Sequence, residues 1–140
     1  MGKQKSLLVN ATMENLDTVM EFVEKQLEQE ACPMKVIGQI LVSLEEVYVN
    51  VVNYAYDDAV GECEILSAVE PWENGAKLTL TIRDKGRPFD PLAKEDPDIT
   101  LSADERQIGG LGIYMVKKSM DEVTYENIAG YNTLTICKKW

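Results

Sequence analysis

The segment that most constrains this chain is residues 34–56, MKVIGQILVSLEEVYVNVVNYAY, which directly follow Pro33. Proline is favoured where a helix begins, because its missing N–H would have no intrahelical partner there. Apolar side chains would cover most of the circumference of this helix, and a helix of that kind is buried on more than one side. The sequence therefore predicts a central helix that packs against a sheet and ends between residues 57 and 61.

The other periodic segments supply the sheet and two more helices. An amphipathic helix is predicted to begin near Thr12, because apolar residues recur from there at spacings of three and four. Either Thr12 or Asn15 would cap its N-terminal end. A third helix is predicted after the glycines at 109–112 and ends near Met120. Short apolar or alternating runs predict five strands, at 5–11, 62–69, 76–83, 122–127 and 132–138. Asn74-Gly75 indicates a hairpin, with a connection longer than two residues.

The order of these elements indicates the fold class. Helices that share one face of a sheet form a two-layer structure. We therefore expect an α+β fold, a two-layer sandwich with its helices packed on one face of a mixed, mainly antiparallel sheet. Residues 1–140 are expected to form a single domain.

Composition excludes several classes of function. The chain has 14 Lys and Arg against 24 Asp and Glu, a net charge of -10, which would repel phosphate backbones and anionic lipid. No nucleic acid and no membrane is therefore expected as a partner, and no apolar run is expected to reach the length of a membrane span. The chain has no histidine, which excludes an imidazole base and His-ligated metals. Its three cysteines lack C-x-x-C spacing, which indicates reduced thiols of a cytoplasmic protein.

The first group of candidate functional residues lies on the central helix. Glu46, Asn50 and Tyr54 recur every four residues and so form one stripe. A carboxylate and an amide are costly to bury without partners, so the stripe would face a ligand or a polar cavity. The carboxylate can accept a proton, and the amide oxygen is a hard ligand suited to Mg²⁺. The same spacing also fits a solvent-facing edge of the helix.

Two further groups lie at turns. Asp84 and Gly86 begin the run DKGRPFDP directly after a strand, where the carboxylate can accept a hydrogen bond from an exocyclic amine. Glycine there lets a flat ring approach the backbone, although Asp, Gly and Pro also dominate ordinary turns. Gly110 and Gly112 close a long loop, 92–108, and open a helix whose N–H groups can face phosphate. A hinge before a helix cap would show the same glycines.

The three groups in series resemble the Bergerat-type ATP-binding fold (GHKL) shared by gyrase-type ATPases, MutL and sensor histidine kinases. Glu46, Asn50 and Tyr56 match a motif similar to E-x-x-x-N-x-x-x-H-x-Y, with Tyr54 where histidine often stands. The run DKGRPFD matches the second motif, and GGLGIYMVKKSMDEVTY matches the third almost throughout. The chain looks most like the free-standing branch that contains bacterial anti-sigma factors that are serine kinases.

At the end of the site that would bind adenine, called here the base end, the resemblance implies three roles. Asp84 would hold the adenine amine, and Gly86 would pass beside the ring. Thr133, on the last strand, would join through a water.

At the phosphate end, the resemblance implies ATP and Mg²⁺ as cofactors. Asn50 would coordinate the Mg²⁺, and Glu46 would be the catalytic base. Gly110 and Gly112 would lie by the phosphates, with 92–108 as the ATP lid. Tyr54 in place of histidine would affect turnover more than nucleotide binding.

The function implied is a Mg-ATP-dependent serine-protein kinase and anti-sigma regulatory factor. Its substrate would be a STAS-type anti-anti-sigma protein in a partner-switching pathway, with a sigma factor as a second partner and a homodimer formed through the sheet. The alternative is a nucleotide-gated protein-binding module with little or no kinase turnover. The two differ in whether a partner gains phosphate.

Overall fold

The structure, a computed structural model, describes residues 3–56, 60–88, 90–93 and 110–140. The helices are α1 (Leu16–Gln29), α2 (Met34–Tyr54) and α3 (Gly110–Ser119), with short 3₁₀ turns at Met13–Asn15 and Pro91–Ala93. The strands are β1 (Lys3–Asn10), β2 (Glu62–Trp72), β3 (Gly75–Asp84), β4 (Glu122–Ile128) and β5 (Tyr131–Lys139). The element order is the predicted one. Of the predicted lid, residues 94–108 lie outside the described residues.

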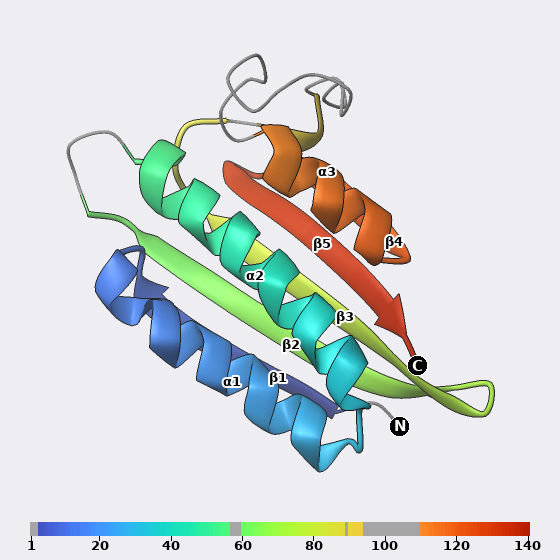
Figure 1. The fold of residues 1–140 in the computed structure, drawn as a ribbon. Helices are drawn as coiled ribbons and strands as arrows, with labels where there is room; N and C mark the ends of the chain where they lie inside the picture. The colour runs from blue at the N-terminus through green and yellow to red at the C-terminus, as the bar shows by residue number, and fades with distance from the viewer. Residues whose placement is uncertain (1–2, 57–59, 89, 94–109) are drawn as a thin grey trace.

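The five strands form one sheet in the order β1-β2-β3-β5-β4, and every pairing among them is antiparallel. The three helices lie on the same face of this sheet, with α2 between α1 and α3 (Figure 1). The predicted α+β two-layer fold is therefore confirmed. Strand β3 lies at the middle of the sheet, so its last residue is supported by strands on both sides.

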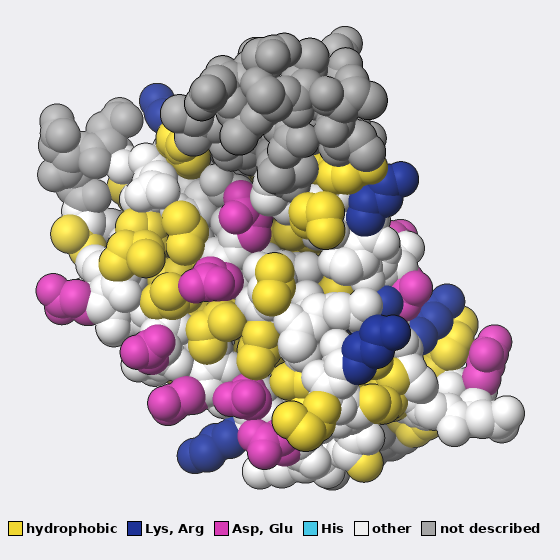
Figure 2. Space-filling view, viewed as in Figure 1, with side chains coloured by type: hydrophobic (Ala, Val, Ile, Leu, Met, Phe, Trp, Pro, Cys, Tyr) yellow, Lys and Arg dark blue, Asp and Glu magenta, His cyan; other side chains and the backbone are white. Residues whose placement is uncertain are grey.

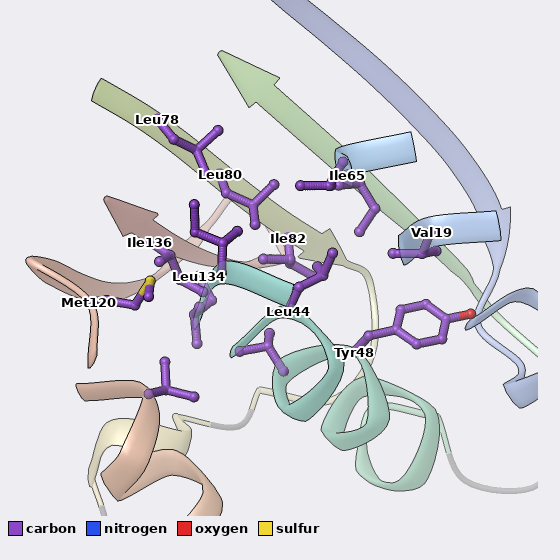
Figure 3. Close-up of a cluster of buried hydrophobic side chains, with 14 of the residues drawn as sticks. Val19, Leu44, Tyr48, Ile65, Leu78, Leu80, Ile82, Met120, Leu134 and Ile136 are labelled. Carbon is purple, nitrogen blue, oxygen red and sulfur yellow. The ribbon is translucent and has the colours of Figure 1, made fainter. Parts of the chain in front are cut away.

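The core lies between α2 and the middle strands. Strand β3 alternates between buried and half-buried residues, as a strand covered on one face should. Figure 3 shows Leu44 projecting from α2 toward the side chains of the sheet, whereas Tyr48 points toward the side of Val19 on α1. Both are fully buried, as is Ile82 of β3. Burial of this kind stabilises by about 1.5–3 kcal/mol for each large apolar side chain.

The apolar character of α2 differs from the expectation that no run of the chain is suited to span a membrane. Its 21 residues are long and apolar enough, by length and composition, to cross a membrane, whereas no run of that kind was expected. Packing explains the composition: the side of α2 that faces the sheet is buried from Ile37 to Val51 at helical spacing. The acidic pair Glu45 and Glu46 interrupts the opposite side. The helix thus serves as the central packing element that the sequence predicted.

The first hairpin is tighter than predicted. Pairing continues to Trp72 opposite Gly75, so the connection is the two residues Glu73 and Asn74, with φ of Glu73 at 49°. The prediction of a longer connection was wrong because the flanking strands extend further than their apolar runs. Gly75 then allows the chain terminus to approach: a Cβ there would lie 1.8 Å from the carbonyl oxygen of Trp140.

The entry to α1 also differs from the prediction. Neither Thr12 nor Asn15 makes a side-chain capping bond. The Asn15 amide instead donates to the carbonyl of Asn10 at 2.8 Å, and the buried Tyr48 hydroxyl donates to the carbonyl of Thr12 at 2.7 Å. The segment between β1 and α1 is thus held by the Asn15 side chain and by Tyr48 of α2, not by a side-chain cap.

Candidate functional site

A pocket opens between α2 and the middle of the sheet, beside the start of α3. Its cavity is small, about 40 Å³, and it is partly open to solvent. Most of its lining is apolar. Its four polar lining residues are Asn50, Asp84, Tyr125 and Asn132. An apolar pocket with a few fixed polar groups suits a flat heteroaromatic ligand.

Asp84 ends strand β3 and is 5% exposed. Its Oδ1 atom accepts two hydrogen bonds, from the backbone N–H of Gly86 at 2.8 Å and from the Asn132 amide at 2.9 Å. Among the residues that the structure describes, none donates to its other oxygen, Oδ2. A carboxylate oxygen that lines a pocket and has no donor among these residues is suited to accept a hydrogen bond from a ligand amine.

The turn after Asp84 is fastened to the end of α2. The backbone N–H of Arg87 donates to the carbonyl of Ala55 at 2.9 Å, which satisfies one of the last carbonyls of the helix. A Cβ on Gly86 would lie 2.1 Å from that same carbonyl oxygen, so only glycine fits. Tyr56 adds a further tie, since its hydroxyl accepts the backbone N–H of Lys85 at 2.9 Å. The second motif is therefore packed against the first.

Glu46 and Asn50 lie one turn apart on α2 and are both half-buried. Burial raises the pKa of the Glu46 carboxyl above its ordinary value, a hydrogen bond with the Asn50 side chain opposes that shift, and the nearby Glu45 charge adds to it. A carboxylate with a raised pKa is a better proton acceptor than an ordinary one. Asn50 also lines the pocket, so it links the carboxylate to the ligand space.

The Glu46 carboxylate lies directly against the first turn of α3. A Cβ placed on Gly112 would lie 2.1 Å from Glu46 Cδ and Oε1 and 2.5 Å from Oε2. Gly110 begins the same helix. The N-terminal end of a helix favours negative charge, so this is a suitable place for a carboxylate. The first and third sequence motifs therefore meet at Glu46 and Gly112.

Two residues singled out from the sequence lie apart from this group. Thr133 follows Asn132 on β5, so its side chain points to the opposite face of the sheet. Its hydroxyl donates to the carbonyl of Tyr131 at 3.3 Å, and it does not line the pocket. The Tyr54 side chain is 37% exposed and does not line the pocket either. This placement gives no support to the prediction that Thr133 contacts adenine through a water.

Sequence reasoning missed Asn132 and Tyr125. Asn132 is 6% exposed and its side-chain Nδ2 donates to Asp84, while the Tyr125 hydroxyl on β4 donates to the side-chain Oδ1 of Asn132. One signal was available: Asn132 stands in phase with the apolar residues Leu134 and Ile136. An amide at a position of that kind needs partners inside the protein.

Comparisons with known proteins agree with this geometry. The profile of the histidine kinase-like ATPase domain matches residues 9–138. Anti-sigma F factors of a Thermoanaerobacter species and of Thermoanaerobacter pseudethanolicus are each 22% identical over 104 residues, which is 74% of this chain and 70% of theirs. The serine/threonine-protein kinase BtrW of Bordetella bronchiseptica is 32% identical over 60 residues, 43% of this chain and 42% of that kinase.

A solved structure shares the fold. It contains the RsbU and RsbW domains of Rv1364c from Mycobacterium tuberculosis and aligns with a TM-score of 0.65 at 18% identity. The alignment covers 97% of this chain and 32% of that one, so this chain spans about a third of its length. The relatives are those of the anti-sigma branch that the motifs resembled. Since the domain profile covers residues 9–138, the chain belongs to the histidine kinase-like ATPase domain family, whose domain binds ATP.

Proposed function

We propose that the chain is a Mg-ATP-dependent serine-protein kinase and anti-sigma regulatory factor. Its substrate is a STAS-type anti-anti-sigma protein in a cytoplasmic partner-switching pathway. The observation that carries the proposal is the Glu46 carboxylate, seated between Asn50 and the first turn of α3 beside a pocket that contains Asp84. Anti-sigma factors and a serine/threonine-protein kinase among the relatives support the same reading.

In this proposal, Asp84 and the apolar lining bind the adenine of ATP. Oδ2 of Asp84 accepts the exocyclic amine, because Oδ1 is already used by Gly86 and Asn132. Gly86 keeps the turn close to α2, so that Asp84 stays at the pocket. Thr133 has no direct role in binding adenine, because its side chain lies on the other face of β5.

Glu46 is the catalytic base. It accepts the hydroxyl proton of the substrate serine as the serine oxygen forms a bond to the γ-phosphorus, and the bond from that phosphorus to the bridging oxygen breaks with release of ADP. Bound Mg²⁺ would neutralise charge on the phosphates, and the Asn50 amide oxygen is the residue suited to hold it. Gly110 and Gly112 bring the N-terminal end of α3 to the phosphate end, with 92–108 as the proposed lid.

The decisive variant is Glu46→Gln, which preserves shape and removes the proton acceptor. Phosphoryl transfer should fall by about 10²–10⁴-fold, the usual contribution of a general base, while ATP affinity stays close to that of the wild type. The measurement is the intact mass of a co-encoded STAS-type protein after incubation with Mg-ATP. Glu45→Gln is the matched control, because it removes an adjacent exposed carboxylate. Transfer by Glu46→Gln at the wild-type rate would refute the assignment of the base.

A second candidate is a nucleotide-gated protein-binding module with little or no turnover. The observation that favours it is Tyr54, which stands where the resembled motif has histidine and lies exposed outside the pocket. The acidic side chains over α1 and α2 would attract a basic partner (Figure 2). This candidate is supported if the partner binds in a nucleotide-dependent way while neither phosphorylated partner nor ADP accumulates.

Two further partners belong to the proposal. A sigma factor would compete with the STAS-type protein, and a second copy of the chain would pair through the sheet. The face of the sheet opposite the helices is uncovered in the described residues, which leaves room for such pairing. Sedimentation of the chain alone and with a sigma factor measures both.

A further inference from the structure

We propose that Asn132 sets the purine preference of the site, because it saturates one oxygen of Asp84 and so leaves a single acceptor for the base. The inference rests on the proposed binding of the base at Asp84. Asn132 does not itself contact the base in this account. It is a positioning residue that acts through the carboxylate.

Asn132 is held in one orientation by bonds at both ends of its amide. Its Nδ2 donates to Oδ1 of Asp84 and to the carbonyl of Arg87, both at 2.9 Å. Its Oδ1 accepts from the hydroxyl of Tyr125 and from the amide of Asn127, the latter at 3.3 Å. A backbone carbonyl can only accept, so the contact with Arg87 fixes which end of the amide is the donor. The side chain therefore has no freedom to turn away from Asp84.

The consequence for Asp84 is a carboxylate with unequal oxygens. Each carboxylate oxygen has about two lone-pair sites. On Oδ1 both are occupied, one by the N–H of Gly86 and one by the Asn132 amide. No described residue donates to Oδ2. Asp84 thus offers the pocket one accepting oxygen rather than two.

Adenine and guanine present different sets of hydrogen-bond donors to such a carboxylate. Adenine presents one exocyclic amine, which a single oxygen can satisfy. Guanine presents a ring N–H beside its exocyclic amine, and a carboxylate binds that pair best with both oxygens. With Oδ1 saturated, bound guanine would keep a donor without a partner in an apolar pocket, and a buried unpaired donor is strongly disfavoured. Asn132 therefore discriminates against guanine.

The test compares the dissociation constants of Mg-ATP and Mg-GTP by calorimetry for the whole chain. Asn132→Ala frees one lone pair of Oδ1, and the ratio of the GTP constant to the ATP constant should fall by about tenfold, the effect of one ordinary hydrogen bond. Tyr125→Phe loosens Asn132 without touching Asp84 and should lower the ratio less. Asn127→Ala, which removes an exposed partner of the same amide, is the matched control and should leave the ratio near that of the wild type.

The outcomes separate this inference from the proposed function. A wild-type chain that binds neither nucleotide overturns binding of the base at Asp84, and this inference with it. A wild-type preference for ATP that Asn132→Ala and Tyr125→Phe both leave unchanged overturns only the role of Asn132. Equal loss of both nucleotides in Asn132→Ala, with the ratio preserved, gives Asn132 a purely structural role and also refutes the inference. If Asn132→Ala fails to fold, as monitored by circular dichroism, Asn132→Ser and Tyr125→Phe supply the same comparison.

Discussion

The two ends of the site are built by different means. At the base end, Asp84 is held by directed hydrogen bonds from Gly86 and Asn132, each of 2.8–2.9 Å. At the proposed catalytic end, Glu46 is positioned by close packing against Gly112, and the Asn50 side chain one turn away on α2 partly offsets the rise in the pKa of its carboxyl. Strands support the first end, whereas the second lies where two helices meet.

The two ends should therefore respond differently to substitutions near the carboxylate. A carboxylate fixed by several bonds keeps its geometry until a bond partner is removed. A carboxylate fixed by packing is displaced by any added volume, and its half-buried position also makes its pKa sensitive to nearby charge. We therefore expect the base end to control which nucleotide binds, and the catalytic end to control whether transfer follows binding.

Among the variants that test this comparison, Gly112→Ala should have the largest effect, a loss of phosphoryl transfer. The added methyl group would lie 2.1 Å from the Glu46 carboxylate, which must move away because it is the mobile end of a side chain. A displacement of about 1 Å at a reacting group costs up to about 10²-fold in rate, so transfer should fall by about that factor. Transfer in a single turnover at saturating Mg-ATP measures the loss separately from any change in ATP affinity. Transfer at the wild-type rate under these conditions would contradict the importance of the contact between Gly112 and Glu46.

The next largest effect is on stability, from Gly86→Ala. Here the added methyl group would meet the backbone carbonyl of Ala55 at 2.1 Å, and backbone at a helix end cannot yield as a side chain can. We expect a loss of about 1–3 kcal/mol in the free energy of unfolding, measured by denaturant titration.

Gly38→Ala is the matched control for that variant. It lies within α2, and no atom lies within 4 Å of the position its Cβ would take. It should therefore stabilise the chain by about 0.5–1 kcal/mol, since alanine favours helix interiors. If both variants destabilised equally, close approach to Ala55 would not be the cause.

The smallest effect is a shift in the pH dependence of transfer, from Glu45→Gln. The Glu45 charge raises the pKa of Glu46, so its removal lowers that pKa. In the proposed role of base, Glu46 accepts a proton only when it is ionised, and with the lower pKa it stays ionised to lower pH. The acidic limb of the pH–rate profile should therefore move to lower pH. The shift should be small and weaken with added salt, because Glu45 is exposed and its charge is screened. A shift toward higher pH would contradict this account.

Much of the fold could be predicted because it depends on local patterns. Apolar periodicity indicated α1, α2 and every strand. The limits of β2 and the cap of α1 could not be predicted in this way. They depend on strand pairing and on the Tyr48 hydroxyl, which comes from a distant part of the sequence.

The residues of the site also divide into those that local patterns could predict and those that depend on the assembled sheet. Spacing placed Glu46 and Asn50 on one stripe, and it placed Asp84 at a strand end, because both relations are set by the geometry of one element. The choice of Asn132 over Thr133 depends on which face of β5 meets the helices. A slip of one residue in a strand exchanges its faces, and only the assembled sheet fixes that register.

The order of the elements, the family and the types of residue available for the chemistry could be read from the sequence. These follow from periodicity and from motif spacing, which are properties of the chain alone. The tertiary structure alone decided that the Glu46 carboxylate fits against Gly112, that Gly86 fits against Ala55, and that Asp84 keeps one oxygen for a ligand. The first two are contacts between residues at least 31 positions apart, and the third depends on which donors surround one carboxylate, so local sequence does not encode any of them.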